Sequence, residues 1–103
     1  MPRPPAFPSA ASFSSRIATQ IQDREDQQTA INEDQARLRE NLKALKGGAE
    51  ERELIQRYTH QLNTEEDTLD RLKKELGHLD VQQESAQQEL KKTIDDLALT
   101  VDL

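Results

Sequence analysis

Bulky apolar residues are scarce in this sequence, and cysteine is absent. Only 33% of its 103 residues are hydrophobic, and its aromatic residues are Phe7, Phe13 and Tyr58, with no tryptophan. This supply is too small for a compact globular core, so the chain is either disordered or built from long helices that share a narrow apolar seam. The absence of cysteine excludes disulfides and thiolate chemistry.

Positive charge is also in short supply. The net charge is −6, and acidic and basic residues are mixed along the chain. Binding to nucleic acid or to an anionic membrane surface requires a positive patch, so neither is expected as a partner. No apolar run approaches the roughly 18 residues of a membrane-spanning helix, so no transmembrane segment is expected.

All four prolines fall within the first eight residues. Proline removes amide donors and restricts the residue before it, so residues 1–13 are expected to form a flexible leader. The start lacks the continuous apolar stretch of a secretory signal. Its arginines and serines, with no acid before Asp23, are also typical of a mitochondrial transit peptide, and the localisation stays open.

Beyond the leader, apolar residues recur at steps of three and four, which is the heptad pattern of a coiled coil. The pattern predicts one helix at about 14–46, a turn at Gly47 and Gly48, and a second helix at about 49–99. The apolar seam positions of the first helix are Ile17, Ile21, Ile31, Leu38, Leu42 and Leu45. Those of the second are Ile55, Tyr58, Leu62, Leu69, Leu72, Leu76 and Leu79.

The short Gly-Gly turn predicts that the two helices run antiparallel, so the fold class is all-α, a long two-helix hairpin. A turn centred near residue 50 predicts a register in which the numbers of facing residues add up to about 100. Leu38 then faces Leu62, and two polar seam residues, Gln35 and Glu65, share one layer. This layer either fixes the register, or its side chains reach out to water because a two-helix seam is thin.

The second helix is longer than the first and carries its apolar pattern beyond the predicted pairing. The residues of this overhang are Ala86, Leu90, Ile94, Leu97 and Val101. They need a partner, and we expect two chains to associate into a four-helix arrangement over part of their length. The leader is an alternative partner, with Phe13 expected to contact the helix around Ala86 and Leu90.

The motifs of common catalytic and cofactor sites are absent from the sequence. It has no phosphate-binding glycine loop, no paired cysteines and no HExxH motif. His60 and His78 both lie outside the seam positions, so we expect both side chains to be exposed to solvent. The sequence therefore predicts a protein that is not an enzyme and has no catalytic residues, no metal site and no cofactor.

The stretch DQARLRENLKALKGGAEERELIQRYTHQLNTEEDTLDRL, residues 34–72, and the terminal LKKTIDDLALTVDL carry a family likeness. They resemble the C-terminal coiled-coil tail of mucoidy-inhibitor-A-like bacterial proteins, a family of unknown function. Members also contain a β-rich domain, which has no counterpart here, and the leader does not match. The resemblance implies a detached tail or a truncated relative of bacterial origin, an envelope setting, and no catalytic residues.

The pattern as a whole favours a non-catalytic structural or protein-interaction module. Its partner is expected to be a second copy of the chain or a domain of a parent protein. The alternative is a chaperone-like or adaptor hairpin that grips a client protein with its tip. The predicted tip, Lys46 to Ala49, offers no apolar grip for such a client.

Overall fold

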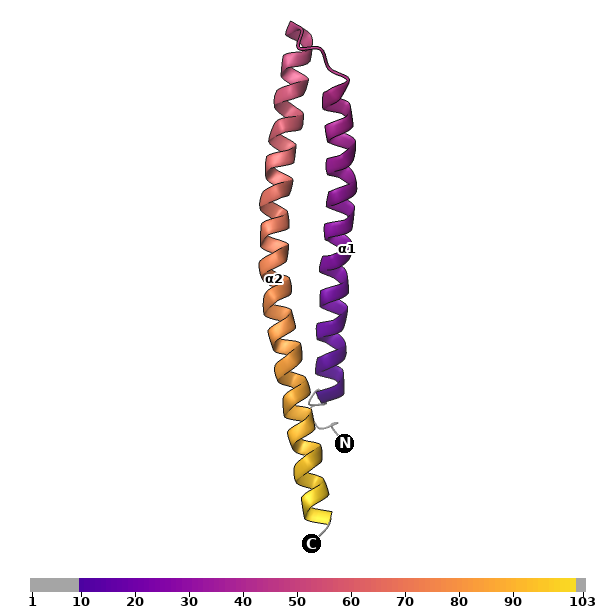
Figure 1. Cartoon of the computed structure of the whole chain (residues 1–103), viewed down its shortest axis with the longest axis vertical. Coiled ribbons are helices and arrows are strands. Elements are labelled where there is room, and N and C mark those ends of the chain that lie inside the picture. The colour runs from indigo at the N-terminus through magenta and orange to yellow at the C-terminus, as the bar shows by residue number, and fades with distance from the viewer. Residues whose placement is uncertain (1–9, 102–103) are drawn as a thin grey trace, which may run out of the picture. The chain divides into compact units, whose positions relative to one another are not determined.

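The computed structural model describes residues 10–101, which form two helices and contain no strand. Helix α1 comprises Ala10–Lys43 and helix α2 comprises Ala49–Val101, joined by a short loop (Figure 1). Neither proline nor glycine interrupts α1, and α2 contains only Gly77, so both sequences can support long helices. The prediction of an all-α helical hairpin is confirmed.

The helix boundaries differ from the predicted ones at three points. Helix α1 begins at Ala10 rather than at residue 14, so residues 10–13 belong to the helix and not to a leader. It ends at Lys43 rather than at residue 46, because Ala44 forms a turn in which the Leu45 amide donates to the Leu42 carbonyl at 3.2 Å. Helix α2 continues to Val101, past the predicted end at 99. The rest of the predicted leader, residues 1–9, lies outside the described residues.

The loop is shaped by its two glycines and by Glu51. Gly47 has a φ of 79°, in the left-handed region that residues with a side chain rarely adopt. The Gly48 carbonyl accepts the amides of Glu51 and Arg52 at 3.1 and 3.0 Å and so starts α2. The Glu51 carboxylate accepts the backbone amides of Lys46 and Gly48, which is the reciprocal half of a capping box.

The described chain divides into two compact units, and the first to consider is residues 23–75, around the loop. Here α1 and α2 pack through the fully buried side chains of Leu38 and Leu72. The remaining predicted seam residues of this unit are partly buried; they are Ile31, Leu42, Leu45, Ile55, Tyr58, Leu62 and Leu69. Arg24 donates to Glu75 at 3.3 Å, and Gln35 donates to Glu66 at 3.0 Å. These pairs add up to 99 and 101, in agreement with the predicted register near 100.

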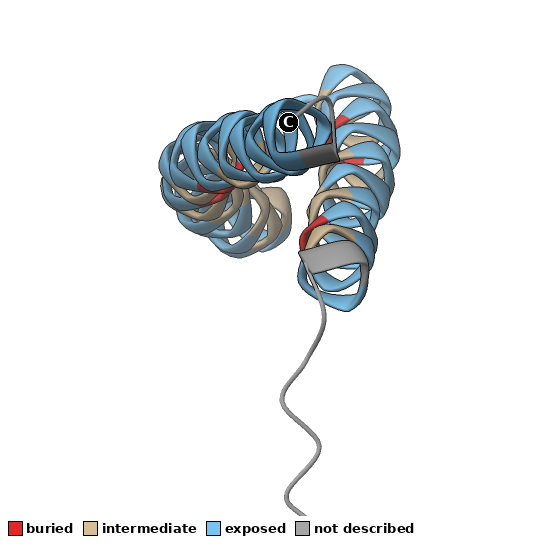
Figure 2. Ribbon diagram, turned by 90° about the horizontal axis from the view of Figure 1, so that it is seen from below, coloured by how far each residue is buried: buried red, intermediate tan, exposed pale blue. Residues whose placement is uncertain are grey.

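The second unit contains residues 10–22 of α1 and residues 76–101 of α2. Its buried side chains are Ile17 and Leu79, and Ile21 and Leu76 are partly buried beside them. The α2 segment of this unit is about twice as long as the α1 segment, so α2 continues past the start of α1 (Figure 1). The last turns of α2, near the C label, are exposed on all sides (Figure 2).

Candidate interaction surfaces

An apolar stripe on the last turns of α2 is the first candidate surface. Steps of four, four and three residues join Ala86, Leu90, Ile94 and Leu97, and this spacing keeps them on one side of an α-helix. We call these four residues the C-terminal stripe. They carry on the same side of α2 that is buried at Leu79, through the partly buried Gln83.

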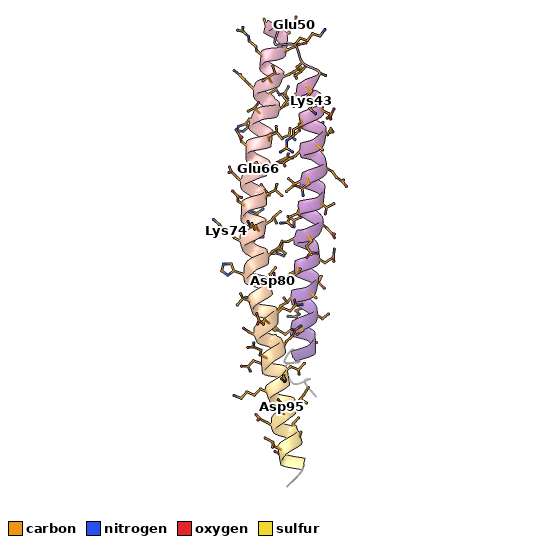
Figure 3. All side chains as sticks on the ribbon, viewed as in Figure 1. Lys43, Glu50, Glu66, Lys74, Asp80 and Asp95 are labelled. Atoms are coloured by element: carbon orange, nitrogen blue, oxygen red, sulfur yellow. The ribbon has the colours of Figure 1, made fainter. Side chains whose placement is uncertain are left out.

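Exposure increases along the C-terminal stripe towards the chain end. Ala86 is partly buried, whereas Leu90, Ile94 and Leu97 are 38%, 55% and 61% exposed. Asp95 marks this part of α2 in Figure 3, beyond the start of α1. The side chain of Val101, which was predicted to extend the overhang, lies outside the described residues. The predicted contact of Phe13 with this region stays a prediction, and Phe13 is 46% exposed.

The second candidate feature is a layer of polar residues inside the seam, in the unit of residues 23–75. Gln35 is 4% exposed, and its Nε2 donates to Oε1 of Glu66 rather than to Glu65. Gln35 and Glu65 were predicted to share one layer; in the structure each side chain contacts a different residue, so this part of the seam contains two separate pairs, Gln35 with Glu66 and Glu65 with Asp34. Facing helices are staggered, so a seam residue contacts positions on both sides of the one directly opposite.

Glu65 pairs with Asp34, its neighbour across the layer. The two carboxyl groups are hydrogen-bonded to each other, and burial together with this bond raises the pKa of Glu65 to about 7. The same bond lowers the pKa of Asp34, with further help from Arg37. A proton held by Glu65 and donated to the Asp34 carboxylate accounts for both directions.

The groups around this carboxyl pair favour a charge on Asp34 and not on Glu65. Arg37 donates to Asp34 Oδ1 at 2.7 Å, and Gln61 donates to Asp34 Oδ2 at 3.0 Å. By contrast, Oε1 of Glu65 is shielded from solvent and has no hydrogen-bond donor among the described residues. Two neighbouring carboxylates repel each other when both are ionised, and this repulsion favours the protonated form of Glu65.

Sequence reasoning found Gln35 and Glu65 but missed their partners Asp34 and Glu66. Both missed residues directly precede or follow a seam position, and each is polar where its neighbour is also polar. Both could have been found by searching each helix for polar residues next to a polar seam position, since Asp34 precedes Gln35 on α1 and Glu66 follows Glu65 on α2.

The remaining candidate groups do not converge. His60 and His78 are both exposed on α2. Within residues 10–101, no three histidine or acidic side chains lie close enough together to hold a metal ion. The described helices also include none that is long and apolar enough to cross a membrane. The interhelical loop exposes Gly47 and Gly48 and keeps Leu45 partly buried.

Comparison with protein-family models, with curated proteins and with solved structures gives no match to this chain.

Proposed function

We propose that this chain is a non-catalytic coiled-coil interaction module that binds a protein partner through the C-terminal stripe of α2. The observation that carries the proposal is the continuation of the buried seam as an exposed one. Leu79 is 7% exposed, whereas Leu97, farther along the same side of the helix, is 61% exposed. A helix that is apolar on one side gains most of its stability by covering that side.

The energy available at the stripe supports a binding role. Fully burying a leucine or isoleucine side chain contributes about 1.5–3 kcal/mol. The mostly exposed Ile94 and Leu97 therefore retain much of that contribution for a partner. The polar layer around Gln35 has a different role in the proposal: it holds α1 and α2 in one register.

On the resemblance of residues 34–72 to the tails of mucoidy-inhibitor-A-like bacterial proteins, we also propose a bacterial origin. A domain of a parent protein of that family is then an alternative partner for the stripe. This part of the proposal rests on the resemblance alone, and a co-purification of the chain with such a domain tests it.

The general proposal is tested by photocrosslinking from two sides of the same helical turns. A benzoylphenylalanine at Ile94 places the reactive group on the C-terminal stripe, and one at Lys92 places it on the opposite side of α2. The proposal predicts adducts with protein, of the same chain or another, from position 94 and few from position 92. Equal labelling from both positions, or none from position 94, contradicts it.

A further inference from the structure

We draw no further inference here: the strongest candidate, the exposed apolar stripe of Leu90, Ile94 and Leu97 on the last turns of α2, belongs to the surface already proposed to bind a partner, and nothing in the described residues shows what covers it.

Discussion

At the scale of single residues, the carboxyl pair of Asp34 and Glu65 gives the chain a pH-dependent contact. The pKa of Glu65 is raised from 4.5 to about 7 in the folded state, so folding binds a proton there. Its contribution to stability is therefore complete below about pH 4.5 and is lost as the pH rises through about 7. Asp34 acts in the other sense, because its pKa is lowered and its contribution is lost as the pH falls through that lowered value.

We predict that the chain unfolds at a higher temperature at about pH 5 than at about pH 8, as far as Glu65 determines the difference. Glu65→Gln keeps a hydrogen-bond donor towards Asp34 and removes the titration, so this variant should lose much of the pH dependence. The measurement is the midpoint of thermal unfolding by circular dichroism across that pH range. Glu53→Gln, at an exposed position, is the control. An unchanged pH dependence in Glu65→Gln would rule out this role for Glu65.

The polar layer also shows what a sequence can and cannot predict at this scale. The heptad pattern identified Gln35 and Glu65 as seam positions, because that depends only on spacing along each helix. It did not identify the partners Asp34 and Glu66, because these depend on stagger and on side-chain rotamers across the seam. The direction of the pKa shift at Glu65 likewise depends on which oxygen is shielded, which spacing alone does not give.

At the scale of the helices, spacing predicted two helices and their turn, while the exact ends depended on local hydrogen bonds. The end of α1 at Lys43 follows from the Leu45 to Leu42 turn and from the positive φ of Gly47. The apolar pattern continues through Leu45 and gives no sign of this earlier stop. The start at Ala10 lies beyond the last proline, where alanine and serine tolerate a helix and the seam pattern has not begun.

Gly47 and Gly77 should respond to alanine in opposite directions. Gly47 has a positive φ, so Gly47→Ala should destabilise the chain by roughly 1–2 kcal/mol although no atom obstructs the new methyl group. Gly77 lies inside α2 with no atom within 4 Å of an added Cβ, so Gly77→Ala should stabilise it by about 1 kcal/mol. Urea unfolding of both variants measures the difference. Destabilisation by Gly77→Ala would mean that a side chain at this position disturbs the packing.

The register of the hairpin can be tested within residues 23–75. Leu38 is fully buried and Leu62 is partly buried, and the register near 100 places them face to face. We predict that Leu38→Cys/Leu62→Cys forms a disulfide within one chain on mild oxidation, seen as a mobility shift at the mass of a single chain. Leu38→Cys/Leu72→Cys is the control and should link poorly. Efficient linkage in the control and not in the first variant would contradict the register.

At the scale of the whole chain, the sequence predicted the all-α hairpin because helix period, proline placement and the glycine turn all indicate the same fold. It predicted the overhang for the same reason. The interaction proposal adds that the overhang is incomplete alone, since its apolar residues are covered only when another helix binds. Stability and association are then linked. A partner that binds only the folded chain raises the apparent stability of the chain as the partner's concentration rises.

Hydrogen exchange of the full chain in dilute solution tests this claim most directly. The account predicts that amides of residues 90–101 exchange fast in dilute solution, because no helix of the chain covers Leu90, Ile94 and Leu97. Amides around Leu38 and Leu72 should be protected throughout, because those side chains are buried within one chain. Protection of residues 90–101 in dilute solution equal to that around Leu38 and Leu72 would contradict the account.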